Sequence, residues 1–172
     1  TQTYAYEPKD VLTDEWSWSA GTDAASAGDS KDVVIRNNNN KAFFVGAADS
    51  ELNVNNGQGQ QYKFRFIKSG NANNRYKIYA VDAQKFVKWT RSNRVGHITE
   101  LVDEKNANDW LVVYNNGANT YNGAFDIIAG NVNYSDVATC WNPHGGMGAN
   151  RAIGGWYAND PNSAWQICKE YN

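Results

Sequence analysis

One pattern of apolar residues occurs three times in this chain of 172 residues. Each copy opens with an apolar residue, any residue and an isoleucine; these isoleucines are Ile35, Ile78 and Ile127. Each copy closes with an aromatic residue that is followed two positions later by an apolar one; these aromatics are Phe64, Trp110 and Trp165. The openings are 43 and 49 residues apart, and the closings are 46 and 55 residues apart. Two shorter apolar runs separate each opening from its closing, so the sequence predicts three repeats of about four strands.

The composition favours strands over helices. The chain has 13 Val and 8 Ile against 4 Leu and 1 Met. Branched side chains of this kind fit a pleated, half-buried surface better than a long amphipathic helix. The Asn-Gly dipeptides at 56–57, 116–117 and 122–123 suit the tight turns of hairpins. These features exclude a helical bundle and a coiled coil.

Three copies of four strands predict an all-β fold, the β-trefoil, in which three hairpins cap a six-stranded barrel. We expect repeats at about residues 31–70, 73–117 and 122–172, with the closing aromatics meeting on a pseudo-threefold axis. The third strand of the second repeat is expected at 95–98, where the sequence runs from Val95 to Ile98. Residues 1–30 are rich in small and polar residues and are expected to form an N-terminal extension or linker that packs on the domain.

The charge balance argues against two kinds of partner. The 16 Lys and Arg residues and 18 Asp and Glu residues give a formal net charge of −2. Such a balance offers no electrostatic attraction to a phosphate backbone, so we expect no nucleic acid partner. No apolar run approaches the roughly 20 residues that cross a bilayer, so we expect no membrane span.

Motifs of common enzymes are missing from the sequence. The two histidines, His97 and His144, lie in different repeats, and no His-x-x-x-His or Cys-x-x-Cys spacing could hold a metal. There is no Gly-x-Ser-x-Gly turn and no phosphate-binding loop. A pair of carboxylates for glycoside cleavage stays open, because such groups need only be neighbours in space. We therefore expect a non-catalytic chain with no metal and no cofactor.

The third repeat contains the best candidate for a binding site. A glycine-rich stretch there carries aromatic and polar residues, and sugars bind to an aromatic face with planar polar groups around it. The candidate ligand-binding residues are Trp141, His144, Asn150, Arg151, Trp156 and Asp160. Trp141 or Trp156 would stack on the sugar, and Arg151 would add directional or anionic-sugar contacts. In the alternative interpretation the two tryptophans pack on each other over the barrel mouth, and the loop is simply long.

A secondary candidate site lies in the second repeat. It comprises Asp82, Trp89, Arg91 and Asn93. Its alternative is structural, because Trp89 ends an alternating strand and could face the core. The run of asparagines at 37–40 is interpreted as a solvated turn.

The two cysteines, Cys140 and Cys168, are candidates for one disulfide. Such a bridge would link two points in the last third of the chain. Its formation depends on a geometry that a sequence does not specify, so the cysteines leave the redox compartment open.

Residues 32–172 resemble the β-trefoils of the ricin-B type, a class of lectins and carbohydrate-binding modules whose repeats end in a Gln-x-Trp strand. Trp110 and Trp165 stand at the Trp position, and Phe64 replaces it in the first repeat. Other residues stand at the Gln position, namely Tyr62, Asn108 and Ser163. The resemblance implies the trefoil fold, because the Trp is a core anchor, but it transfers no sugar site from the family.

In style and length the chain is also similar to accessory modules of secreted glycoside hydrolases from gut Bacteroidetes. This similarity implies a non-catalytic carbohydrate-binding module with a glycan partner and a catalytic domain in the same polypeptide. It also implies an extracellular, cell-surface or periplasmic location. Two other functions stay open. One is a protease inhibitor of the Kunitz soybean type, which usually carries two disulfides, and the other is a structural domain that docks on a neighbouring catalytic domain.

Overall fold

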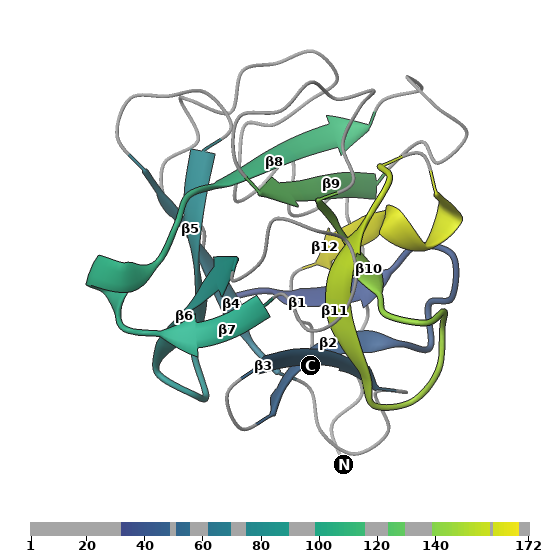
Figure 1. The fold of residues 1–172 in the computed structure, drawn as a ribbon, viewed down its shortest axis with the longest axis horizontal. Coiled ribbons are helices and arrows are strands. Elements are labelled where there is room, and N and C mark those ends of the chain that lie inside the picture. Colours follow the sequence, from purple (N-terminus) through teal and green to yellow (C-terminus); the bar gives the residue numbers. More distant parts are fainter. Residues whose placement is uncertain are drawn as a thin grey trace.

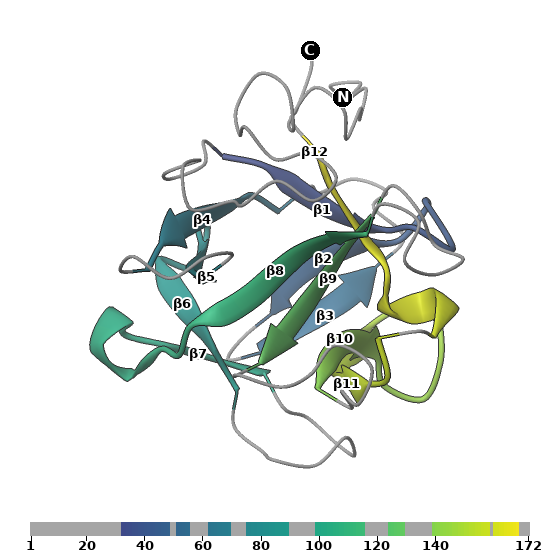
Figure 2. The same cartoon turned by 90° about the horizontal axis from the view of Figure 1, so that it is seen from above.

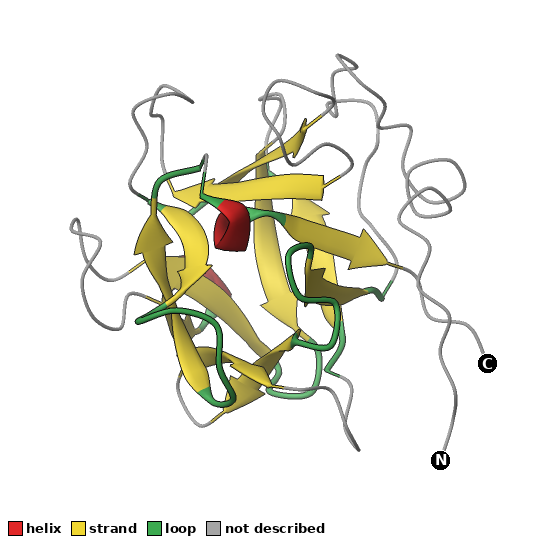
Figure 3. Ribbon diagram, turned by 90° about the vertical axis from the view of Figure 1, so that its right-hand side faces the viewer, coloured by secondary structure: helices red, strands yellow, loops and turns green. Residues whose placement is uncertain are grey.

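The computed structural model describes residues 32–48, 51–55, 62–69, 75–89, 99–115, 124–129, 139–158 and 160–168. The expected N-terminal extension, residues 1–30, lies outside them. The first group of strands is β1 (Val34–Asn37), β2 (Phe44–Ala48), β3 (Glu51–Asn55) and β4 (Phe64–Lys68). The second group is β5 (Arg75–Ala80), β6 (Lys85–Trp89), β7 (Thr99–Val102) and β8 (Trp110–Asn115). The third group is β9 (Ala124–Ala129), β10 (Cys140–Pro143), β11 (Arg151–Trp156) and β12 (Trp165–Cys168). Strands make up most of the regular structure, as Figure 3 shows.

Six of these strands form a closed barrel. Each group contributes its first and last strand, and antiparallel pairs run from β4 to β5, β8, β9, β12 and β1 in turn. The ring closes between β1 and β4, where the backbone N–H groups of Val33 and Phe64 each donate to the other's carbonyl at 2.8 Å. Figure 2 shows the barrel strands from above. Closure leaves these strands without an open edge along which other chains could add.

The middle strands of each group form a hairpin, and the three hairpins cap the barrel. In Figure 1, β6 and β7 lie on the left, β2 and β3 at the bottom, and β10 and β11 on the right. β3 also pairs with β11. Thr99 of β7 forms hydrogen bonds with both of these strands. Its Oγ1 accepts from Leu52 N in β3 and donates to Ile153 O in β11, both at 3.3 Å. A six-stranded barrel with three hairpin caps is a β-trefoil, so the predicted fold class is confirmed.

The core contains the closing aromatics of the repeats together with further tryptophans. Trp89, Trp110, Trp141 and Trp165 form an edge-to-face row, with successive ring centroids 6.0, 5.6 and 6.3 Å apart. Trp110 Nε1 donates to Val87 O at 3.0 Å, and Trp165 Nε1 donates to Trp141 O at 2.8 Å. Edge-to-face contacts of this kind add about 0.5–1.5 kcal/mol each beyond the area they bury. The row therefore ties the second and third repeats together at the centre of the molecule.

The third strand of the second repeat is described from Thr99 onward, as β7 (Thr99–Val102). The predicted run at 95–98 falls outside the described residues. Thr99 and Leu101 face inward and Glu100 faces outward. Thr99 is buried although it is polar, because both hydrogen-bonding roles of its hydroxyl are satisfied by neighbouring hairpins.

Candidate functional site

A pocket of about 410 Å³ lies in the third repeat, between the outer face of the β10–β11 hairpin and the segment that leads into β12. We call it the third-repeat pocket. Its lining residues are Asn142, Pro143, His144, Gly145, Gly146, Gly155, Trp156, Asp160 and Asn162. The pocket therefore gathers three of the predicted ligand-binding residues, which are His144, Trp156 and Asp160.

Asn142 lines the pocket, and two hydrogen bonds fix its side-chain amide. Its Nδ2 donates to Asp160 Oδ1 at 3.1 Å and to Ser163 Oγ at 2.9 Å. The residue opposite Asn142 in the hairpin is Gly154, which has no side chain to crowd the amide. Both Nδ2 protons are thus used within the protein, and Oδ1 is left as an acceptor for a ligand.

Asp160 begins the short 3-10 turn η5 (Pro161–Ser163). Its Oδ1 accepts from Asn162 N at 2.9 Å, and Pro161 follows at the first position of the turn, where no N–H is needed. Ser163 stabilises the turn, because its Oγ donates to Tyr157 O at 2.8 Å. Asp160 Oδ1 is therefore occupied by protein donors, whereas Oδ2 has no hydrogen bond within the described part of the chain.

The loop between β10 and β11 contributes His144, Gly145 and Gly146 to the lining of the pocket. Gly145 and Gly146 have φ angles of +79° and +101°, a left-handed conformation that glycine adopts without strain. A Cβ at Gly145 would lie 2.9 Å from Arg151 Nη1, and one at Gly148 would lie 3.2 Å from Arg151 Nε. The Arg151 guanidinium thus packs along this loop, and glycine at 145 leaves room for it.

Asn150 and Arg151 lie at the junction of two hairpins and do not line the pocket. Asn150 has a φ of +61°, and its backbone N donates to Val54 O at 2.8 Å. Arg151 lies opposite Val54, where β11 pairs with β3. These two predicted residues are therefore not in the lining with His144, Trp156 and Asp160, although the Arg151 guanidinium packs against Gly145, which lines the pocket.

Trp156 and Trp141 have opposite environments. Trp156 exposes 39% of its surface and contacts Tyr157 edge to face, with a centroid distance of 5.6 Å. Trp141 is fully buried between Trp110 and Trp165. The prediction that Trp141 could stack on a sugar is therefore wrong.

The register of the hairpin explains the difference between these tryptophans. Trp141 lies opposite Gly155, and Trp156 lies opposite Cys140. Directly opposed residues share a face and successive residues alternate, so Trp141 faces the barrel and Trp156 faces outward. The alternative interpretation, in which the two rings pack on each other, is also wrong for this reason.

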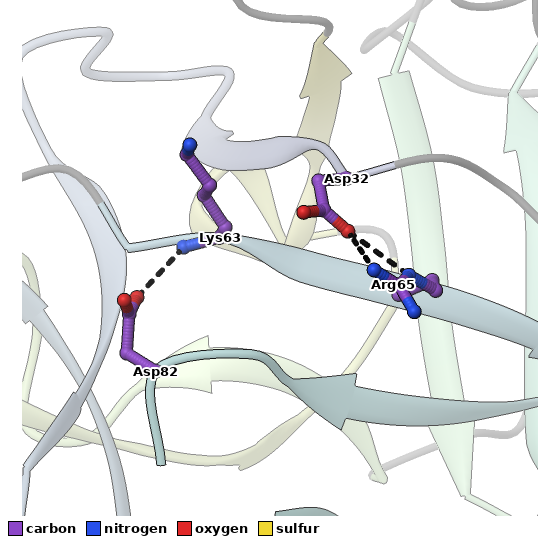
Figure 4. A network of polar contacts seen from close by, with 4 residues as sticks. All are labelled: Asp32, Lys63, Arg65 and Asp82. Carbon is purple, nitrogen blue, oxygen red and sulfur yellow. Dashed lines mark hydrogen bonds and ion pairs between the residues drawn. The ribbon is translucent and has the colours of Figure 1, made fainter. Parts of the chain in front are cut away.

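The structure describes only part of the secondary candidate site. Arg91 and Asn93 lie outside the described residues. Asp82 lies in an exposed turn, where its Oδ2 accepts from the backbone N of Lys63 at 3.3 Å, near the ion pair of Asp32 with Arg65 (Figure 4). Trp89 is half-buried and packs against Trp110, in line with its alternative interpretation as a core residue.

Cys140 is a free, buried thiol that donates from Sγ to Ser163 O at 3.3 Å. The candidate disulfide with Cys168 is therefore not formed. The backbone register accounts for this, because Cys140 lies opposite Ile128 and Trp156 whereas Cys168 lies opposite Val34. Burial raises the pKa of the Cys140 thiol well above its usual value, and the nearby charge of Asp126 raises this pKa further. The thiol stays protonated and serves as the donor in its hydrogen bond to Ser163 O.

The asparagine run at 37–40 supports the pocket from the first repeat. Asn37 Oδ1 accepts from the backbone N of Asn39 at 2.9 Å and of Asn40 at 3.2 Å, which forms a turn as expected. Asn37 itself is buried and not solvated, so the expectation of a solvated turn is wrong for this residue. Asn37 Nδ2 donates to Asn162 O at 3.0 Å. Asn39 Nδ2 donates to Asn162 Oδ1 at 2.9 Å. This hydrogen bond fixes the orientation of the Asn162 amide, in which Oδ1 faces Asn39 and Nδ2 points away from Asn39.

Sequence reasoning missed Asn142 and Asn162 as pocket residues. A signal for Asn142 was present, because it follows the buried Trp141 in a strand and so lies on the opposite face. The sequence Asp160-Pro161-Asn162 is also typical of a capped turn. The contact of Asn162 with Asn39 left no local signal, because the two residues are 123 positions apart.

Two structural features are absent from the described residues. Among them, no group of three His, Cys, Asp or Glu side chains is placed to hold a metal ion. No helix in the described ranges is both long and apolar enough to cross a membrane.

Comparison with known proteins supports the fold alone. No protein-family model matches the sequence, and no curated protein matches it. Among solved structures, the designed threefold symmetric protein ThreeFoil is similar, with a TM-score of 0.59 and 12% sequence identity. The match covers 80% of this chain and 98% of ThreeFoil. The chain therefore shares a threefold trefoil architecture with that protein.

Proposed function

We propose that this chain is a non-catalytic carbohydrate-binding module and that the third-repeat pocket is its glycan site. One observation carries the proposal. The exposed ring of Trp156 lines a pocket in which Asn142 and Asp160 are fixed by protein hydrogen bonds, and each still has an acceptor atom for a ligand.

The chemistry of a sugar matches these groups. A sugar ring has an apolar C–H face, which packs on an indole, and a rim of hydroxyl groups, which donate to fixed carbonyl and carboxylate oxygens. Because Ser163 and Asn162 already hold Asn142 and Asp160, little side-chain freedom is lost when a ligand binds.

The number of carboxylates in the pocket supports a non-catalytic role. Glycoside hydrolysis generally uses two carboxylates that flank the scissile bond. Asp160 is the single carboxylate among the described residues that line the pocket. Such a lining suits binding better than cleavage.

We also propose a wider setting for the module, which rests on the similarity of the chain in style and length to accessory modules of glycoside hydrolases. In it the chain is an extracellular, cell-surface or periplasmic module that holds a glycoside hydrolase domain of the same polypeptide near its glycan. An open pocket binds weakly on its own, and tethering compensates by raising the effective concentration of the catalytic domain.

Calorimetric titration against a panel of neutral oligosaccharides tests the proposed site. We expect saturable binding by the parent chain. Trp156→Ala should weaken it about tenfold or more, because it removes the stacked ring with its buried area and about 0.5–1.5 kcal/mol of aromatic contact. Calorimetry is preferred to fluorescence for this variant, because the substitution also removes an exposed fluorophore.

Tyr157→Phe is the control, because Tyr157 is equally exposed but does not line the pocket, and the phenyl ring keeps the contact with Trp156. We expect it to bind within about threefold of the parent chain. The proposal fails if no oligosaccharide of the panel binds, or if Trp156→Ala binds as well as the parent does.

A further inference from the structure

The third-repeat pocket has an uneven distribution of charge. Asp160 is the one Asp, Glu, Lys or Arg among its described lining residues. The nearest candidate cation by sequence, Arg151, packs along the backbone of Gly145 and Gly148 and is not part of the lining. A ligand in the pocket would therefore contact the Asp160 carboxylate, whereas Arg151 lies behind the backbone of Gly145 and is not in the lining.

The hydrogen-bonding groups left for a ligand are also specific. Asn142 has used both Nδ2 protons and offers Oδ1, and Asp160 has used Oδ1 and offers Oδ2. Asn162 has used Oδ1 in its bond with Asn39 and offers Nδ2. Among these three side chains the pocket presents two acceptors and one donor.

We infer that the third-repeat pocket selects uncharged glycans and rejects carboxylated or sulfated ones. This inference rests on the proposed function. A hydroxyl group can donate to Asn142 Oδ1 and Asp160 Oδ2 and accept from Asn162 Nδ2. A sugar carboxylate or sulfate has no proton to donate, so it would place its charge against that of Asp160 and leave both acceptors unpaired.

Matched pairs of oligosaccharides test the inference by calorimetry. Each neutral oligosaccharide that binds is compared with its C6-carboxylated form, which has the same linkage and length. We expect the carboxylated form to bind the parent chain about tenfold more weakly or worse. The carboxylate of the ligand and that of Asp160 would both lie in the pocket, and they repel each other even with water around them. Asp160→Asn should reduce that difference at least about threefold, because it removes the charge and retains an oxygen to cap the turn.

Salt provides a measurement that needs no variant. Raising the ionic strength from about 0.01 M to 1 M shortens the screening length from about 30 Å to 3 Å. The discrimination against the carboxylated form should shrink over this range, while the affinity for the neutral form changes little. This result remains informative if Asp160→Asn does not fold.

The possible failures are distinct. If neutral and carboxylated forms bind equally well, or if the carboxylated form binds better and Arg151→Gln removes that advantage, the inference is wrong while the proposed function stands. If neither form binds for any pair, the proposed function is wrong and the inference falls with it. Discrimination that is unchanged in both Asp160→Asn and high salt would also overturn the inference.

Discussion

At the scale of single residues, the tryptophans show how one residue type serves two purposes. Trp110 and Trp165 are buried, and each indole N–H donates to a backbone carbonyl of its own repeat. Trp141 is equally buried, but its Nε1 has no hydrogen-bond partner in the described structure. Trp156, on the outer face of the same hairpin, is exposed. The three core tryptophans therefore differ in the polar contacts that they make, and this difference can be measured.

We predict that Trp110→Phe destabilises the chain more than Trp141→Phe does. Both substitutions lose ring volume, but only Trp110→Phe also loses a hydrogen bond, which is worth about 0.5–1.5 kcal/mol. Trp141→Phe instead removes a buried donor that lacks a partner. Urea unfolding of the two variants should show a difference of about that size in the free energy of unfolding. An equal or larger loss for Trp141→Phe would contradict this account.

At the scale of structural elements, the turn at 37–40 and the turn η5 act as one unit although they belong to different repeats. Asn37 and Asn39 both bind Asn162, and Asn38 N donates to Ala164 O at 2.8 Å. Gln166 Nε2 also donates to Asn38 Oδ1 at 3.2 Å. The first repeat thus sets the position and the amide orientation of a residue that lines the third-repeat pocket.

We predict that Asn39→Ala weakens glycan binding by about three- to tenfold with little loss of stability. The exposed Asn39 side chain contributes one hydrogen bond to Asn162 Oδ1, and without it the Asn162 amide is free to turn. Calorimetry measures the affinity, and thermal unfolding measures the stability. Asn40→Ala is the control, because Asn40 is in the same turn and its Oδ1 accepts from Ala42 N, not from Asn162. Equal effects of the two substitutions would show that Asn39 does not orient Asn162.

At the scale of the whole molecule, strands from opposite ends of the described chain pair with each other in the barrel. β1 pairs with β12 over four residues, from Val34 with Cys168 to Asn37 with Trp165. β12 also pairs with β9. No repeat can therefore complete its own share of the barrel, because each barrel strand depends on a neighbour from another repeat or from the far end of the chain.

We predict that a chain ending at Ser163, which lacks β12, loses the fold of all three repeats together. Removing β12 opens the barrel and removes Trp165 from the core, so β1 and β9 each lose a partner. Amide hydrogen exchange should show lost protection in β5 and β8 as well as in β1. A chain that lacks only residues 169–172 keeps all twelve described strands and should retain protection. Persistent protection of the second repeat in the shorter chain would mean that the repeats fold independently.

Part of this structure was predictable from the sequence because it depends on local patterns. The three opening isoleucines and the three closing aromatics are all buried, as a threefold core requires. The pattern of short alternating runs therefore identified the trefoil. It gave no sign that Thr99, a polar residue in β7, is buried, because the hydrogen bonds that make this burial favourable come from neighbouring hairpins.

The site depended on information that no local pattern contains. The sequence by itself determined that aromatic and polar residues are concentrated in the third repeat, and His144, Trp156 and Asp160 do line one pocket. Only the tertiary structure decided that Trp141 faces the core and Trp156 faces outward, because facing depends on the register of the hairpin, and a shift of one residue would reverse it. Only the closed barrel brings Asn39 to Asn162, because strand pairing between distant segments places side chains together that the sequence keeps 123 residues apart.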